Sequence, residues 1–398
     1  MLPRLPLFQL TRLCSLSRQT TKFQHNYLSP PVPVRSISTT PAPQYAAARI
    51  KVPVVPHRDS FISKTRFTQA DIPDLSFWLN HAVPPLVPNG EVTPAQCLEA
   101  CARYVALATE NAPGWQKRHL SVTATSPVVG SAGDNGGKIP FFTLHYAAVT
   151  LLLFADTRPC YSLVLHILTT GAALGYAPSV LDLARIAHRG GSLHKPQFER
   201  AREGLARLVA AVNNDPTYGR EYRLDTLTLA AQIQLSESNT RASTDRAVRL
   251  LEEAFKTHAA AAAAAAEGEK KNTMPTPTTP IWEWRTTAVL TLSQIYLERK
   301  QVSRARDLLG GAAAALDQPE VYFRYAMLLE PSDPRRRELV QKAAVSGVEE
   351  AAREMARQTR ASLKEEEEEE GLSGWERKAR EAIAYEWAAI AGDEAILE

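Results

Sequence analysis

The chain has 398 residues, of which 44% are apolar and only 7% aromatic. This length allows one large or two ordinary domains with a hydrophobic core, and the four cysteines exclude a disulfide framework. Alanine and leucine supply much of the apolar content, and both lose little side-chain entropy in a helix. We therefore expect an all-α protein.

The N-terminal segment is strongly basic. Residues 1–58 contain eight Arg or Lys residues and no acid before Asp59. They are also rich in Ser, Thr, Leu and Pro, and the stretch LPLFQLTRLCSLSRQ can place leucines and arginines on opposite helix faces. Such a start is typical of a mitochondrial transit peptide, whereas the apolar runs are too short for a secretory signal. We predict a mature start between Ser38 and Tyr45; the alternative is a basic tail that binds nucleic acid or anionic lipid.

The rest of the chain is mildly acidic. Without the eight basic residues of this segment, 38 of the 46 basic residues remain against 43 acidic ones, a net charge of −5. This balance makes nucleic acid an unlikely electrostatic partner. No segment has the roughly 20 apolar residues that a membrane span needs, so we predict no transmembrane segment but leave peripheral membrane association open.

Composition and turn signals divide the chain into segments. We predict a transit peptide (1–40), a proline-rich irregular segment (41–92), a first helical-repeat block (93–258), a poly-Ala and Pro/Thr linker (259–279), a second helical-repeat block (280–363), an acidic run (364–371) and a C-terminal helix (372–398).

The first block opens on Thr93-Pro94, with Gln96 completing a capping box. From residue 141 onward, helical patterns follow one another. We predict helices over 142–155, 159–174, 179–189, 196–212, 216–236, 244–258, 280–299, 302–316, 319–329, 334–346, 348–363 and 372–390. Asp215-Pro216, Thr279-Pro280 and Asp333-Pro334 are start signals. No segment shows a sustained alternation of apolar and polar residues, so the sequence predicts no strand.

The stretch AAVSGVEEAAREMA contains a turn at Ser346-Gly347, with alanines on both sides. Similar spacings recur in residues 168–184, 309–326 and 384–396. The pattern resembles the tetratricopeptide and Sel-one-like helical repeats, although its spacing is irregular and the glycine-rich end of a Sel-one-like unit is missing. The resemblance implies an α-solenoid of stacked helical hairpins with a concave binding surface; the alternative is an irregular helical bundle.

Motifs that carry chemistry are absent or incomplete. Residues 132–139 (AGDNGGKI) approach a phosphate-binding loop, but Ala132 replaces its first glycine and Ile139 stands where a hydroxyl must bind magnesium. His145 and His166 lie in apolar helices, where core packing is the simpler role, and Cys97 and Cys101 are expected to be small buried hydrophobes. We predict no enzyme, no catalytic residue, no cofactor and no metal site.

Aromatic residues interleaved with arginines are the best candidates for a partner-binding surface. They lie in IWEWR, VYFRYA and DPRRRE. The candidates are Trp282, Trp284, Arg285, Tyr322, Arg324, Arg335, Arg336 and Arg337. The last three open a helix, where their charge opposes the helix dipole and invites an acidic partner. The alternative is packing aromatics beside a solvated basic turn.

Together these features predict a non-enzymatic helical-repeat protein of the mitochondrial matrix that mediates protein–protein interactions. The resemblance to helical-repeat proteins of this compartment implies an assembly or maturation factor for a respiratory-chain complex. Two alternatives remain, a mitochondrial RNA- or ribosome-associated factor and an enzyme with an unrecognised site.

Overall fold

The computed structural model describes residues 67–82, 92–122, 137–215, 222–238, 240–270, 282–368 and 373–392. The described residues divide into two compact units, one within residues 41–282 and the other within residues 283–398. The predicted transit peptide and processing site, most of the proline-rich segment, residues 271–279 of the linker and residues 369–371 of the acidic run lie outside the described residues.

The prediction of an all-α fold is confirmed. Within residues 41–282 the described elements are η2 (Gln69–Asp71), α2 (Leu75–His81), α3 (Pro94–Glu110), α4 (Trp115–His119), β1 (Leu120–Ser121), β2 (Ile139–Pro140), α5 (Phe141–Phe154), α6 (Arg158–Leu174), α7 (Ala177–Arg189), η3 (Pro196–Phe198), α8 (Glu199–Asn214), α9 (Arg223–Glu237) and α10 (Arg241–Lys270). Within residues 283–398 they are α11 (Arg285–Glu298), α12 (Val302–Leu316), α13 (Pro319–Ala326), α14 (Pro334–Val345), α15 (Glu349–Glu368) and α16 (Gly374–Ile390).

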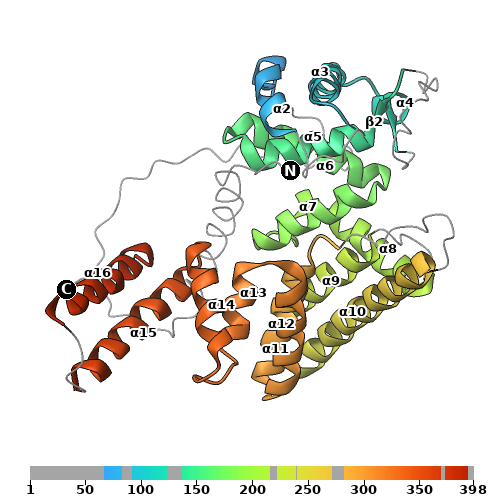
Figure 1. Ribbon diagram of the computed structural model, residues 1–398. Helices are drawn as coiled ribbons and strands as arrows, with labels where there is room; N and C mark the ends of the chain where they lie inside the picture. Colours follow the sequence, from blue (N-terminus) through green and yellow to red (C-terminus); the bar gives the residue numbers. More distant parts are fainter. Residues whose placement is uncertain are drawn as a thin grey trace, which may run out of the picture. The chain divides into compact units, whose positions relative to one another are not determined.

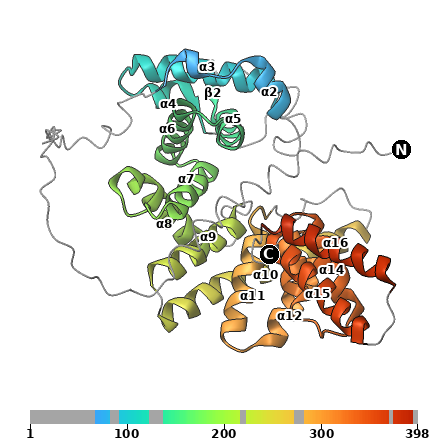
Figure 2. The same cartoon turned by 90° about the vertical axis from the view of Figure 1, so that its left-hand side faces the viewer.

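Most helices pack against their neighbours in the sequence. In the unit of residues 283–398, each helix from α11 to α15 contacts the helix that follows it, and Figure 1 shows this order from orange to red. In the unit of residues 41–282, α5 to α10 are also paired in chain order, with α3 against α5 and α2 against α3 (Figure 2). Both units therefore consist of helical pairs stacked in sequence.

Helix starts follow their capping signals in two predicted cases. Thr93 and Gln96 form the predicted capping box at the start of α3. Asp333 caps α14 by accepting a hydrogen bond from the Arg335 amide at 2.9 Å. The prediction of a helix start at Pro280 is wrong, because α11 begins at Arg285. The indole of Trp282 donates a hydrogen bond to Thr228 Oγ1, so the chain turns into the core before the helix begins.

Other boundaries also differ from the prediction. The helix expected from Pro216 begins at Arg223. Helix α10 continues across the polyalanine to Lys270, and α15 continues into the acidic run, since Ala, Glu and Lys are all good helix formers. The expectation of no strands is wrong in one detail, because Leu120 and Ser121 pair with Ile139 and Pro140. Two residues per strand are too few to show alternation.

The turn at Ser346-Gly347 lies where the sequence predicts it. Gly347 has a φ of 91°, its amide donates to the Ala344 carbonyl, and the Val348 amide donates to the Ala343 carbonyl. This is a Schellman turn, in which a left-handed residue satisfies the last carbonyls of a helix. The same pair of bonds closes the turns at Gly175, Gly191 and Lys300.

The alanines around the Ser346-Gly347 turn fill the crossing of α14 and α15. All five are at most 1% exposed: Ala343, Ala344, Ala351, Ala352 and Ala356. Their predicted role in helix crossing is confirmed, because small side chains let two helix backbones approach closely.

The turns give a first testable prediction. Gly347→Ala places a Cβ at a left-handed position and should lower the free energy of unfolding by about 1 kcal/mol. Lys300 occupies the equivalent position with a φ of 60°, so Lys300→Gly should raise that free energy by about 0.5 kcal/mol. Urea unfolding followed by circular dichroism would measure both. If both substitutions changed the free energy of unfolding in the same direction, the two turns would not share one geometry.

None of the described helices is long and apolar enough to cross a bilayer. The apolar run at 146–155 covers the second half of α5 and its C-cap residue Ala155, and its side chains Ala147, Ala148, Thr150 and Leu151 are buried. Helix α5 is therefore a core helix, as the sequence predicts.

Candidate protein-binding surface

The basic turn that opens α14 is partly neutralised by its own cap. The Asp333 carboxylate accepts a hydrogen bond from Arg335 Nη2 at 2.7 Å as well as from its amide. These bonds lower the pKa of Asp333. The side chain of Arg335 is 63% exposed. The unfavourable charge at the helix start is thus offset by a carboxylate, and the guanidinium of Arg335 remains accessible.

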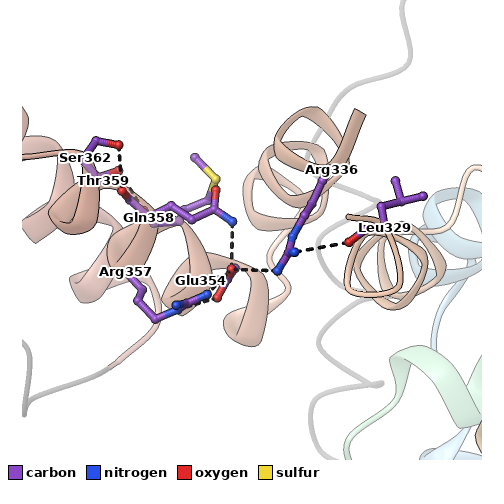
Figure 3. Close-up of polar contacts among 8 residues, drawn as sticks. Leu329, Arg336, Glu354, Arg357, Gln358, Thr359 and Ser362 are labelled. Atoms are coloured by element: carbon purple, nitrogen blue, oxygen red, sulfur yellow. Dashed lines mark hydrogen bonds and ion pairs between the residues drawn. The ribbon is translucent and has the colours of Figure 1, made fainter. Parts of the chain in front are cut away.

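Arg336 faces the opposite way from its two neighbours. Its side chain is 15% exposed, and its guanidinium donates to the Leu329 carbonyl at 3.3 Å and pairs with Glu354 Oε1 at 3.7 Å. Figure 3 shows Arg336 between these two groups. One guanidinium thereby joins the turn after α13, the first turn of α14 and the middle of α15.

The carboxylate of Glu354 is only 9% exposed but has a full set of donors. Arg357 binds both oxygens, at 2.8 and 2.6 Å, and Gln358 Nε2 donates at 2.9 Å (Figure 3). A buried carboxylate is tolerated only when it is paired and hydrogen-bonded in this way. We call the contacts among Leu329, Arg336 and Glu354 the α14 brace.

The unit of residues 41–282 contains a brace of the same kind. Arg223, at the start of α9, is 8% exposed and donates to the Val212 carbonyl of α8 at 2.5 Å. Its other nitrogen lies 3.4 Å from Glu253 of α10. In both units an arginine early in one helix, buried at Arg223 and largely buried at Arg336, contacts a carbonyl earlier in the chain and a glutamate on the next helix. Neither brace is predicted by the sequence, since the arginine and the glutamate of each lie on different helices.

A second polar cluster joins α12, α13 and α14. The Tyr322 hydroxyl donates to Asp317 Oδ1 at 2.5 Å, and Lys342 Nζ lies 2.8 Å from that hydroxyl and 3.0 Å from Asp317. Hydrogen bonds from Tyr322 and Lys342 lower the pKa of Asp317, and hydrogen bonds to Tyr322 and Asp317 raise the pKa of Lys342. Tyr322 is thus buried against the helix ends, while Lys342 is half-exposed.

The aromatic candidates lie inside the protein. Trp282, Trp284 and Tyr322 are at most 7% exposed, and Trp282 packs against Phe255 and His258. Arg285 is half-buried, and burial lowers its pKa. These side chains have the packing role that the sequence left as the alternative.

The exposed candidates are Arg324 on α13 and Arg335 and Arg337 on α14. Helices α13 and α14 are packed together. Neither Arg324 nor Arg337 forms an ion pair with another described residue. We call these three residues the α13–α14 basic surface. Arg324 and Arg337 can attract an acidic partner without first breaking an ion pair within the described residues, whereas Arg335 is paired with Asp333.

A Ser-His-Asp arrangement occurs in the unit of residues 41–282. His145 Nδ1 lies 3.2 Å from Ser179 Oγ, and His145 Nε2 lies 3.5 Å from Asp182 Oδ2. The elements resemble a nucleophilic triad. Ser179, however, is 0% exposed and faces Gly171 across the contact of α6 and α7, so no substrate can reach its hydroxyl in this conformation. The cluster belongs to the core, which agrees with the predicted packing role of His145.

Asp182 makes stability depend on pH. Burial raises its pKa from 3.8 to about 6, against the opposing pull of Arg185 and Arg189. The folded state therefore binds the carboxyl proton of Asp182 more tightly than the unfolded state does. Above pH 6, where the carboxylate is ionised in both states, this lowers the free energy of unfolding by about 3 kcal/mol. That penalty is absent below pH 4 and grows as the pH rises to 6. Asp182→Asn should therefore gain stability relative to the wild type over this range. Urea midpoints of both proteins at pH 4 to 7 would measure the gain. A difference between the two midpoints that does not change with pH would contradict the prediction.

The remaining candidates for chemistry are buried or half-buried. Cys97 and Cys101 are 0% exposed, and burial raises the pKa of Cys97 to about 12, so both thiols stay protonated, as expected of small core residues. His166 Nδ1 lies 2.8 Å from the Tyr104 hydroxyl, inside the fold. Most of the glycine loop lies outside the described residues, while Ile139 is 1% exposed and pairs with Leu120. No group of three or more His, Cys, Asp or Glu side chains within the described ranges is placed to bind a metal.

The chain shows no significant match to known family models, curated proteins or solved structures.

Proposed function

We propose that this chain is a mitochondrial helical-repeat protein that binds other proteins and acts as an assembly or maturation factor for a respiratory-chain complex. The observation that carries the proposal is the packing of successive helical pairs in both units. Stacked helical pairs offer long surfaces formed by neighbouring helices, and such surfaces suit protein binding better than a single catalytic pocket. The respiratory-chain assignment rests on the resemblance to helical-repeat proteins of this compartment.

Two recurring features support descent from a tetratricopeptide-like or Sel-one-like repeat. The Schellman turns at Gly175, Gly191, Lys300 and Gly347 end helices in the same way. The Arg223 and Arg336 braces join three successive chain segments in the same order. The separations from arginine to glutamate differ, 30 residues in one brace and 18 in the other, as the irregular spacing of the sequence pattern predicts.

The mitochondrial location rests on the acid-free, arginine-rich residues 1–58. Import of the full chain into isolated mitochondria, followed by N-terminal sequencing of the protease-protected product, tests it. We expect a mature start between Ser38 and Tyr45. A protected product that retains Met1 would contradict a cleaved presequence, and a product that stays protease-sensitive would contradict import.

The α13–α14 basic surface is the proposed contact for an acidic partner. Arg324→Glu combined with Arg337→Glu should weaken partner binding by about tenfold, because attraction becomes repulsion at two exposed positions. The matched control is Arg207→Glu with Arg249→Glu, which makes the same charge change at exposed positions of α8 and α10. Quantitative mass spectrometry of proteins recovered with each tagged variant provides the measurement. Equal recovery with both double variants would place the partner elsewhere.

A further inference from the structure

Helix α16 has a second apolar face. Ala384 and Ala388 of α16 and its C-cap residue Ala391 are at most 3% exposed and lie on the side that packs against α15. On the other side, Trp375 is 77% exposed, Ile383 47% and Ile390 56%. Large apolar side chains gathered on one outer face indicate a contact surface rather than a solvated one.

The helical period places these residues on one face of α16, about 100° wide. At about 100° per residue, positions 375, 379, 382, 386 and 390 fall on the face opposite Ala384, and position 383 lies beside them. We call Trp375, Ala379, Ala382, Ile383, Glu386 and Ile390 the outer stripe of α16. Along 17 residues it measures roughly 25 Å, enough for one helix-to-helix contact.

The outer stripe is complementary to itself when a second copy is turned antiparallel. Its midpoint falls between Ala382 and Ile383. Pairing about that point places Trp375 opposite Ile390 of the second copy, and Ala382 opposite Ile383 of the second copy. Each large side chain at the centre therefore meets a small one, as close helix packing requires.

The charges agree with the same arrangement. The pairing places Glu386 of each copy opposite Ala379 and within one residue of Lys378 of the other. Among the described residues, Lys378 and Glu386 have no ion pair, whereas Arg377 is already paired with Glu381 at 3.1 Å. Helix α16 carries three basic and three acidic residues, so it offers no net charge to an anionic membrane.

We propose that the outer stripe of α16 binds a second copy of this chain in an antiparallel, two-fold symmetric contact. A two-fold contact uses the same surface on both chains, and the self-complementary stripe meets that requirement. A single helix pair is smaller than a standard interface, so the dimer forms with a dissociation constant on the order of micromolar. The proposal rests on α16 alone and does not depend on the proposed function.

Sedimentation equilibrium of the full chain at about 1 to 100 µM tests the contact. We expect a reversible monomer–dimer equilibrium that Ile383→Glu weakens at least tenfold. The control Ala361→Glu also adds a negative charge at an exposed position, but on α15, and should leave the equilibrium unchanged. Circular dichroism of each variant separates loss of the contact from loss of folding.

A charge exchange tests the two-fold geometry itself. Lys378→Glu and Glu386→Lys should each weaken dimer formation, because like charges then face each other. An equimolar mixture of the two variants should recover it, since both cross-pairs become opposite in charge. A full chain that is monomeric at the highest concentration, or a mixture that stays monomeric, would overturn the proposal. Monomeric protein that co-sediments with phosphatidylcholine vesicles through Trp375 would also overturn it, in favour of a membrane surface.

Discussion

Replacing Glu354 with alanine is expected to lower the free energy of unfolding of the unit of residues 283–398 by about 3–5 kcal/mol. The substitution leaves the Arg336 guanidinium, 15% exposed, without its carboxylate and removes the acceptor for Arg357 and Gln358. Urea unfolding of the full chain, with hydrogen exchange to locate the loss, measures the effect. We expect it in α13 to α15.

Two further variants make this prediction specific. Arg357→Ala removes a side chain that is 67% exposed and keeps the buried pair, so it should cost about 1 kcal/mol or less. The double variant Arg336→Met with Glu354→Leu removes both buried charges and should recover much of the lost stability. A double variant as unstable as Glu354→Ala would contradict the assignment of the loss to an unpaired buried charge.

Gly171→Ala is expected to destabilise the unit of residues 41–282 by about 3 kcal/mol through overpacking. An added Cβ would overlap the ring edge of Phe141 and lie 2.6 Å from the Cβ of Ser179. Both neighbours are 0% exposed, so neither can move into solvent. The contact of α5, α6 and α7 depends on this glycine.

Gly311→Ala is the matched control for that substitution. Gly311 lies inside α12, and nothing lies within 4 Å of an added Cβ. Because alanine is the better helix former, Gly311→Ala should raise the free energy of unfolding by about 0.5–1 kcal/mol. Thermal unfolding of both variants gives the comparison. If Gly311→Ala also destabilised the protein, crowding around the added Cβ would not explain the effect at Gly171.

Local signals in the sequence predict much of the fold. The capping box at Thr93, the Asp333-Pro334 start and the Gly347 turn are each set by a few adjacent residues, and the structure has all three. The alanine crossing of α14 and α15 follows from helical spacing alone. The predicted helix start at Pro280 is wrong because the Trp282 indole is buried and hydrogen-bonded to Thr228, which lies more than 50 residues earlier in the chain.

The side-chain roles were much harder to predict. In DPRRRE the three arginines are equivalent by composition, yet Arg336 points into the brace while Arg335 and Arg337 are exposed. Which of them is buried depends on Glu354, which lies on a different helix. The grouping of His145, Ser179 and Asp182 likewise depends on how α5 and α7 pack, and no spacing in the sequence indicates it.

The proposed protein-binding function is tested most directly by affinity purification of the tagged protein from mitochondria, with and without nuclease treatment. We expect a specific set of partner proteins, including subunits of one respiratory-chain complex or of its assembly intermediates, recovered equally under both conditions. Partners lost on nuclease treatment would contradict direct protein binding and favour the RNA- or ribosome-associated alternative.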